Sequence, residues 1–206
     1  MTDIHVITNE NRARYADLIE LHHRVRHDIF VGEKGWEALR KPDGRDVDAY
    51  DDEHAVYLLA VDGSKLVGGQ RLYPTTRPHM ISEVFPHLVH GSRGIPTGPD
   101  VWEWTRYFVV RERRYGRTDC RLLAAMQQYC LDEGIETVTA VAETWWLPRV
   151  HSVGFKTRPL GVPQMIEGQP TIAVKVSISE DSLASVRRHA GLRGHAILPR
   201  HFAQAA

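Results

Sequence analysis

The first half of the chain carries an ordered series of charged and aromatic side chains. The series forms the patterns R-x3-F-x5-W, D-x2-D, G-G-Q-R and E-x2-R, made by Arg26, Phe30, Trp36, Asp48, Asp51, Arg71, Glu103 and Arg106. Charges of both signs beside flat rings suit a ligand that is itself zwitterionic and aromatic. The same mixture suits nucleic acid poorly, because a polyanion is bound by an excess of basic residues.

A carboxylate lies among large rings in the segment 102–108, which has the sequence WEWTRYF. A regular strand here places Glu103, Thr105 and Tyr107 on one face and Trp102, Trp104, Arg106 and Phe108 on the other, unless a bulge intervenes. Apolar surroundings raise the pKa of a carboxyl group, which makes Glu103 a candidate general base. A surface Glu103 paired with an arginine is the alternative.

A basic segment follows this strand. Six arginines lie between positions 106 and 121, and Gly116 stands just before an expected helix. Backbone N–H groups at a helix start, with a glycine that allows close approach, form an anion site. The R-x-x-G-x-[small] spacing of Arg113, Gly116 and Thr118 resembles the pyrophosphate loop of Gcn5-type acetyltransferases. A solvated basic loop is the alternative.

An acidic segment precedes both, with Asp46, Asp48, Asp51, Asp52 and Glu53. It lacks the glutamate that an EF-hand requires at its twelfth position. Two interpretations remain open, a solvated acidic loop or carboxylates that hold a cationic ligand group. The twelve histidines follow no zinc-ligand spacing, so we expect no metal site.

Composition narrows the function classes. The 206 residues predict a single domain, 1–206, with a sizeable core. Lys and Arg number 26 and so do Asp and Glu, so no overall field recruits nucleic acid. We expect no membrane association, because no apolar run approaches the roughly 18 residues that span a bilayer. Two cysteines without a CxxC spacing and an N-terminus unlike a signal peptide predict a reduced, cytoplasmic protein.

Hydrophobic periodicity predicts a mixture of helices and strands. Helical patterns cover 12–29, 81–88, 119–133 and 145–153, and strand patterns cover 55–61, 66–72, 101–110, 135–142 and 171–178. Asp62-Gly63-Ser64-Lys65 predicts a hairpin turn between the first two strands. This order predicts a mixed sheet flanked by helices, in the α/β or α+β class.

Taken together, these motifs resemble the acyl-homoserine lactone synthase family, the LuxI-type autoinducer synthases. The resemblance runs from about Tyr15 to Ile178 and includes Phe85 in an F-P-x-L segment. It implies a fold like that of Gcn5-related acetyltransferases. It also implies a reaction of S-adenosylmethionine with an acyl thioester, which gives an N-acyl-homoserine lactone, 5′-methylthioadenosine and a free thiol carrier. The lactone is a quorum-sensing signal.

The resemblance assigns roles to residues. Catalysis falls to Glu103, Arg106 and Arg71, and S-adenosylmethionine to Arg26, Phe30, Trp36, Asp48, Asp51 and Arg106. An acyl pocket is expected from Phe85, Trp104, Thr105, Tyr107, Thr144, Trp145, Trp146 and Leu147. The carrier's phosphate and pantetheine are expected at Phe108, Val110, Arg111, Arg113, Arg114, Gly116 and Arg117. Both molecules are substrates, so no cofactor is expected. Arg71 and Arg106 are alternatively structural partners of Asp48 and Glu103, and the tryptophans alternatively belong to a packed core.

The acyl donor is less closely defined by these motifs. The segments RHDIFVGE and EWTRYFVV resemble the subgroup that takes branched or aryl acyl groups from coenzyme A. We therefore favour a short branched or aromatic acyl-CoA over an acyl carrier protein. Two other functions are weighed against this one, an N-acetyltransferase of the same fold and a non-catalytic sensor of acyl-CoA or S-adenosylmethionine.

Overall fold

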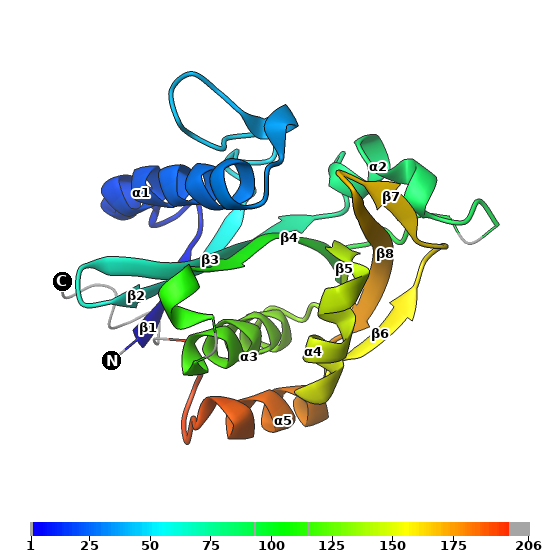
Figure 1. Cartoon of the computed structure of the whole chain (residues 1–206). Helices are drawn as coiled ribbons and strands as arrows, with labels where there is room; N and C mark the ends of the chain where they lie inside the picture. Colours follow the sequence, from blue (N-terminus) through cyan, green and yellow to red (C-terminus); the bar gives the residue numbers. More distant parts are fainter. Residues whose placement is uncertain (1, 93, 115, 198–206) are drawn as a thin grey trace.

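The computed structural model describes residues 2–92, 94–114 and 116–197. Its centre is an eight-stranded sheet in the order β1-β2-β3-β4-β5-β8-β6, with β7 paired to β8 (Figure 1). The strands are β1 (Thr2–Ile7), β2 (Val56–Asp62), β3 (Lys65–Pro74), β4 (Val101–Val109), β5 (Thr137–Glu143), β6 (Lys156–Pro159), β7 (Gln164–Ile166) and β8 (Gln169–Ser177). Neighbouring strands are antiparallel, except for the parallel pair β4 and β5.

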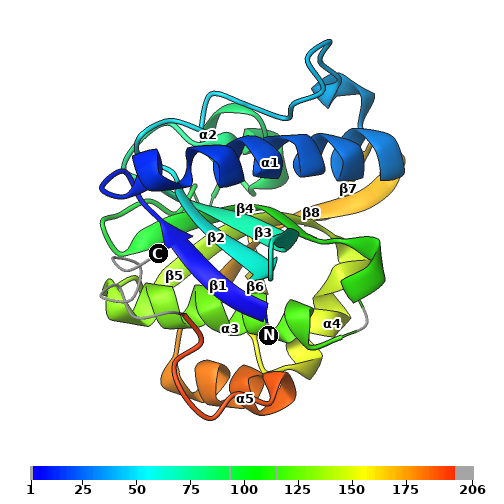
Figure 2. The same cartoon turned by 90° about the vertical axis from the view of Figure 1, so that its left-hand side faces the viewer.

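Helices cover both faces of the sheet (Figure 2). One face carries α1 (Ala16–His27), which continues into a π-helical turn, Asp28–Glu33. The other face carries α3 (Arg117–Asp132), with α5 (Glu180–Ala190) packed beneath it. Two short helices, α2 (Met80–Glu83) and α4 (Leu147–Ser152), lie near the β5–β8 side of the sheet. Short 3-10 turns occupy Arg12–Tyr15, Glu37–Leu39, Pro86–Leu88, Arg111–Arg113 and Thr144–Trp146.

The alternation of side chains in β2 divides the interior into two cores. Leu58 and Ala60 join the core beneath the sheet with Leu122 and Met126 of α3. Tyr57 and Leu59 join the core on the α1 face, together with the rings of Phe30, Tyr50, Tyr73 and Phe108. Because successive strand residues point to opposite faces, one strand contributes to both cores.

A bulge in β4 rearranges the faces that a regular strand would have. The β3–β4 register shifts between Gly69 and Arg71, and Arg106 has a positive φ of 52°. The side chain of Arg106 therefore reaches the α1 face, while Tyr107 packs beneath the sheet with Trp104. The predicted grouping of Tyr107 with Glu103, and of Arg106 with Trp104, is wrong for this reason.

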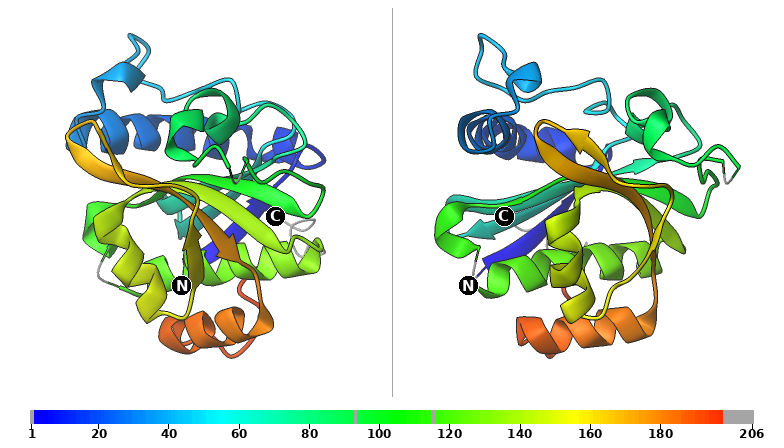
Figure 3. Two further views of the ribbon diagram at one scale, coloured as in Figure 1. Left: turned by 90° about the vertical axis from the view of Figure 1, so that its right-hand side faces the viewer. Right: turned by 45° about the vertical axis from the view of Figure 1, so that its right-hand side comes forward.

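The same bulge marks the place where β4 and β5 separate. Their parallel pairing covers only Val101–Glu103 against Thr137–Thr139, although both strands continue beyond it. Past this point β5 pairs with β8 alone, as far as Glu143. Figure 3 shows how β8 curves and carries β7 towards the α1 side. The sheet is therefore open between β4 and β5, beside the charged segment of β4.

The mixed sheet with flanking helices confirms the predicted class, and most predicted elements are present. The sequence patterns did not predict β1, β6, β7 or α5. Helix α3 starts at Arg117 with Gly116 as its N-cap, and Asp119 lies inside the first turn instead of capping it. Among the described residues, the helices are all too short or too polar to cross a bilayer.

Candidate active site

Three arginines and three aspartates form a network between α1, the 46–51 segment and the sheet. Arg26 is fully buried and donates from Nε to Asp46 Oδ2 at 2.9 Å and from Nη1 and Nη2 to Asp51 at 2.8 and 3.1 Å. The hydroxyl of Tyr57 donates to Asp51 at 2.8 Å. The helix and the acidic segment are therefore joined by a bidentate ion pair away from water.

Two arginines of the sheet complete this network. Arg71 of β3 donates to both oxygens of Asp48 at 2.5 and 3.0 Å and lies 2.8 Å from Asp51 Oδ1. Arg106 of β4 donates from Nε to Asp46 at 2.8 Å, and its Nη2 lies 2.9 Å from Asp48 Oδ2. Arg71 therefore pairs with Asp48, as the structural alternative expected, whereas Arg106 pairs with Asp46 and Asp48 and not with Glu103.

Three arginines balance three aspartates in the network, and the pKa values of Asp46 and Asp51 reflect this pairing. Burial raises the pKa of Asp51, but Arg71 and Arg26 outweigh it and hold that pKa far below its usual range. Burial is likewise overcome at Asp46, where Arg106 and Arg26 lower the pKa. The three aspartates differ in exposure. The side chain of Asp48 is 19% exposed, whereas those of Asp46 and Asp51 are at most 2% exposed. Asp48 is thus the acid that a ligand can reach.

Glu103 lies beside this network but bonds to different groups. Its side chain is buried, and its two oxygens accept the backbone N–H groups of Met80 at 2.9 Å and Ile81 at 2.7 Å, at the start of α2. Burial raises the pKa of Glu103, against the lowering effect of these hydrogen bonds. The alternative of a surface glutamate paired with an arginine is wrong. Each oxygen keeps a second lone pair that can accept a proton.

Phe30 and Trp36 form a stacked aromatic pair on the α1 face of the sheet. Their ring centroids are 5.0 Å apart with an interplanar angle of 14°. Trp36 N–H donates to Phe30 O at 2.9 Å, which fixes the turn between them. The guanidinium of Arg106 lies 5.7 Å from the Phe30 centroid. The structure thus brings together all the residues expected to bind S-adenosylmethionine.

The residues expected to form the acyl pocket fall into four groups. Trp104, Tyr107 and Trp146 cluster beneath the sheet, with centroid distances of 5.3 to 5.6 Å, and Leu147 packs against the same core. Thr105 lies on the other face, where its hydroxyl accepts from Arg71 at 3.0 Å. Phe85 belongs to a separate cluster with Ile81 and Leu88.

The remaining two members of that set lie at the end of β5. Thr144 and Trp145 occupy a 3-10 turn, and Trp145 is 61% exposed. The indole N–H of Trp145 donates to Glu143 at 2.5 Å. Of these groups, the one with Trp104, Tyr107 and Trp146 forms an aromatic wall, in which Trp104 is buried and the other two rings are half-buried.

The rings of that wall are fixed by polar contacts. The indole of Trp104 donates to Gln70 Oε1 at 2.8 Å, and Gln70 donates to Leu122 O at 2.7 Å. The hydroxyl of Tyr107 donates to Asp119, which also accepts from Arg149. Burial raises the pKa of Tyr107, as does the neighbouring Asp119, so its hydroxyl stays protonated. Sequence patterns assigned no role in this wall to Gln70, Asp119 or Arg149, because their partners are distant in the chain.

The basic segment leads into the start of α3, as expected for an anion site. Arg113 pairs with Asp62 at 2.6 Å and Arg114 with Glu33 at 2.5 Å, and both side chains remain more than a third exposed. Arg111 and Arg117 are exposed, and Gly116 precedes the first helical turn. Val110 N–H donates to Val67 O at 3.0 Å, so it is not a free donor for a thioester oxygen.

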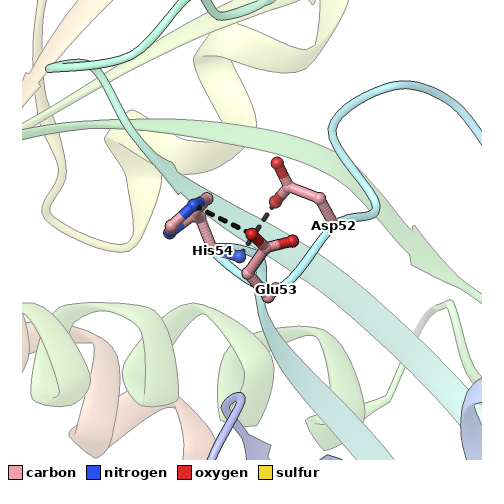
Figure 4. Close-up of side chains that lie close together, drawn as sticks. All are labelled: Asp52, Glu53 and His54. Atoms are coloured by element: carbon pink, nitrogen blue, oxygen red, sulfur yellow. Dashed lines mark hydrogen bonds and ion pairs between the residues drawn. The ribbon is translucent and has the colours of Figure 1, made fainter.

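Two further features lie outside this set. A groove of about 600 Å³ borders α2, and none of the predicted site residues lines it. Among the described residues, Asp52, Glu53 and His54 form one group with possible metal ligands within 4.8 Å of one another (Figure 4). Asp52 already accepts from Tyr73 at 2.8 Å and from the His54 N–H at 2.9 Å. These hydrogen bonds account for the position of the Asp52 carboxylate without a metal ion.

Comparisons with known proteins agree with this geometry. A family profile described as autoinducer synthase matches residues 9–186. The isovaleryl-homoserine lactone synthase of Bradyrhizobium diazoefficiens is 54% identical over 189 residues, which are 92% of this chain and 86% of that protein. An acyl-homoserine-lactone synthase of Ralstonia nicotianae is 30% identical over 84% of this chain and 87% of its own length.

Solved structures extend the comparison. The structure of the CoA-dependent synthase BjaI with S-adenosylmethionine and isopentyl-CoA has a TM-score of 0.91 and 53% identity over 95% of this chain and 92% of its own. The CoA-dependent synthase MesI has a TM-score of 0.86 and 34% identity, over 94% and 98%. A putative N-acetyltransferase from Lactobacillus plantarum, at 16% identity and a TM-score of 0.57 over 86% and 99%, shares the fold alone. The chain therefore belongs to the autoinducer synthase family.

Proposed function

We propose that this acyl-homoserine-lactone synthase takes a short branched acyl group from coenzyme A and transfers it to S-adenosylmethionine. One observation carries the proposal. The sheet separates a charged network on the α1 face from an aromatic wall on the α3 face, and it is open where β4 and β5 stop pairing. A zwitterionic cofactor-like substrate and an apolar acyl chain can therefore meet at this opening from opposite sides. The products are an N-acyl-homoserine lactone, which is a quorum-sensing signal, and 5′-methylthioadenosine.

The polar substrate is assigned to the charged network. Asp48 is the partly exposed carboxylate there, so it is our candidate to contact the α-ammonium. Arg106 is our candidate for the carboxylate, because Asp46 holds it at the edge of the network. Arg26, Arg71 and Asp51 then position these two groups. Phe30 and Trp36 provide ring faces for the adenine or the sulfonium.

The first reaction is acyl transfer. The α-amine of an amino acid has a pKa of about 7.7–8.0, so a base must remove its proton near neutrality. Glu103, directly or through a water, is our candidate base, and its raised pKa suits that task. The nitrogen forms a bond to the thioester carbon, and the carbon–sulfur bond breaks to release the thiol. Such assistance is typically worth about 10²–10⁴-fold.

The second reaction closes the lactone. The carboxylate oxygen forms a bond to the γ-carbon, and the bond from that carbon to the sulfonium breaks. The electron pair stays on sulfur, which leaves as the neutral thioether of methylthioadenosine. Because the leaving group needs no added charge and both reacting groups belong to one molecule, we propose no metal or cofactor.

The acyl donor is proposed from the aromatic wall and from relatives. The rings of Trp104, Tyr107 and Trp146 pack against one another, and we take this bulk to favour a short acyl chain. The relative from Bradyrhizobium is named for isovaleryl transfer, and BjaI is described with isopentyl-CoA. The exposed Arg111 and Arg117 suit the phosphates of coenzyme A.

We further propose that the whole chain acts as one domain in the cytoplasm, where both substrates are made.

The test is a donor panel with S-adenosylmethionine. Matched isovaleryl, aryl, butanoyl and long-chain acyl groups are offered as coenzyme A and as acyl carrier protein thioesters, and the lactone is identified by mass spectrometry. We expect isovaleryl-CoA to give the highest kcat/KM, with methylthioadenosine released in equal amount. Acylation without methylthioadenosine would indicate an ordinary N-acetyltransferase, and binding without turnover a sensor. A long-chain acyl carrier protein as the sole donor would overturn the donor proposal.

A further inference from the structure

The ammonium group of Lys34 lies among three aromatic rings at the site proposed for S-adenosylmethionine. Its Nζ is 4.9 Å from the ring centroid of Trp36, 5.9 Å from that of Trp145 and 6.0 Å from that of Phe30. A cation within about 6 Å of a ring face is attracted by the ring quadrupole. We call these three residues, Phe30, Trp36 and Trp145, the ring box.

The ring box is built from two distant parts of the chain. Lys34 follows the π-helical turn, with its N–H bonded to Ile29 O at 2.9 Å, and Gly35 with a φ of 73° turns the chain towards Trp36. Trp145 comes from the turn after β5. The link between them is Glu143, whose Oε1 lies 3.2 Å from Lys34 Nζ and whose Oε2 accepts from the Trp145 indole. The contact joins the segment after α1 to the end of β5.

The placement of Lys34 is also reversible. Its side chain is 35% exposed, so the ammonium can return to water at little cost. The side chain of Glu143, by contrast, is 12% exposed. The four-carbon stem of lysine is flexible, which lets the ammonium leave the ring box without movement of the backbone.

We propose that Lys34 is an internal cation that competes with the sulfonium of S-adenosylmethionine for the ring box. This inference rests on the proposed function, in which Phe30 and Trp36 face that substrate. When the substrate binds, its positive charge displaces the ammonium, because two cations cannot share one set of rings and one carboxylate. After lactone formation the sulfur of methylthioadenosine is neutral. Lys34 then occupies the ring box beside the neutral ligand, so only a cationic ligand meets this competition.

Binding measurements on Lys34 variants test this inference. S-adenosylmethionine and S-adenosylhomocysteine differ in the methyl group that makes the sulfur cationic, so calorimetry with both isolates the charge. We expect Lys34→Met to tighten the Kd for S-adenosylmethionine by about fivefold to tenfold, the scale of one cation–π contact. The Kd for S-adenosylhomocysteine and the inhibition constant of methylthioadenosine are both expected to change by clearly smaller factors, because the sulfur of each is neutral.

Two variants serve as controls. Lys34→Arg keeps a cation and should keep the wild-type ratio of the two Kd values. Lys65→Met removes the same charge from the exposed start of β3 and should change neither Kd. Equal changes for both ligands in Lys34→Met, no change, or weaker binding of S-adenosylmethionine would each overturn the inference. If the wild-type protein binds S-adenosylmethionine and makes lactone in those cases, the proposed function survives alone. If the wild type does neither, both proposals fail.

Discussion

At the scale of single residues, the site depends on buried charges that neutralise one another. Arg26 and Arg71 are fully buried, and each is paired in a bidentate manner with an aspartate. Taking such charges out of water costs several kcal/mol for each ion, which close pairing in the interior offsets. Removing one member leaves a charge without compensation. The network is therefore sensitive to any single neutral substitution.

Asp51→Asn is expected to destabilise the fold. The substitution removes the carboxylate that Arg26 and Arg71 share, and breaking such a buried pair costs about 3–5 kcal/mol. The measurement is urea unfolding at pH 7, followed by circular dichroism. Asp43→Asn, which changes an exposed acid in the same loop, is the matched control and should stay within about 0.5 kcal/mol of the wild type.

The same network predicts an acid limit for stability. The pKa values of Asp46 and Asp51 are lower in the folded protein than the ordinary value of 3.8. Their stabilising contribution is therefore fully present above pH 3.8 and is lost as pH falls through the lower folded pKa values. We expect Tm to fall steeply below about pH 4. A Tm that is independent of pH between 3 and 5 would contradict the paired state of these acids.

Glu103→Gln tests the proposed base and reveals a structural cost. Lactone formation should fall by about 10²-fold or more, because the amide cannot remove a proton. The amide NH₂ would also face a backbone N–H of α2, so we expect a loss of about 1–2 kcal/mol in stability. The readouts are single-turnover acylation and thermal unfolding of the same preparation. Near-normal turnover in a folded variant would exclude Glu103 as the base.

At the scale of elements, close contact between α1 and β3 keeps the network in place. Gly69 of β3 lies beneath His22 and Phe108, where an added Cβ would come within 2.9 Å of Phe108 and 3.1 Å of His22. These rings belong to the face that carries Arg26, so a larger residue in β3 would push the helix outward. This packing explains why position 69, two residues before Arg71, is a glycine, which the sequence alone does not show.

Gly69→Ala is therefore expected to cost about 1–3 kcal/mol, the range for an overpacked core. It should also weaken S-adenosylmethionine binding, because α1 carries Arg26 and leads to Phe30. Gly91→Ala is the matched control, since a Cβ there meets no atom within 4 Å, and it should be neutral. Thermal unfolding and calorimetry of both variants check the expectation. Equal effects at the two positions would contradict the packing argument.

Elements and motifs could be predicted to different extents. Local patterns predicted the β2–β3 hairpin, β4 and α3, because periodicity and turn residues act over a few positions. The bulge at Arg106 could not be predicted, since a positive φ at an arginine depends on its pairing with Asp46 and Asp48. The second role of Glu103, as a partner of α2, depends likewise on a contact across 22 residues. Motifs therefore predicted which residues gather, but not how they pair.

At the scale of the whole molecule, the sheet keeps the two proposed binding regions apart. Figure 1 shows α1 on one face of the sheet, with α3 and α4 on the other. The charged network lies on the α1 face and the aromatic wall on the α3 face. They approach each other where β4 leaves β5. Changes in the wall should therefore affect the acyl group and leave S-adenosylmethionine binding almost unchanged.

Trp146→Ala tests this separation. Removing the indole that contacts Trp104 and Tyr107 enlarges the wall region, so the ratio of kcat/KM for hexanoyl-CoA over isovaleryl-CoA should rise about tenfold or more. The KM for S-adenosylmethionine should stay within about twofold of the wild-type value, a difference of less than RT in binding free energy. Trp145→Ala is the control for acyl choice, because Trp145 is exposed and outside the wall. An unchanged acyl ratio in Trp146→Ala would place the acyl chain elsewhere.

The bifacial arrangement also bears on how such signals diversify. Residues beneath the sheet can drift in size while the residues above it continue to recognise one unchanging metabolite. A few substitutions in one layer could thus change the lactone that is made, and with it the receptors that respond to the signal. The amino-acid precursor consumed for each lactone would stay the same.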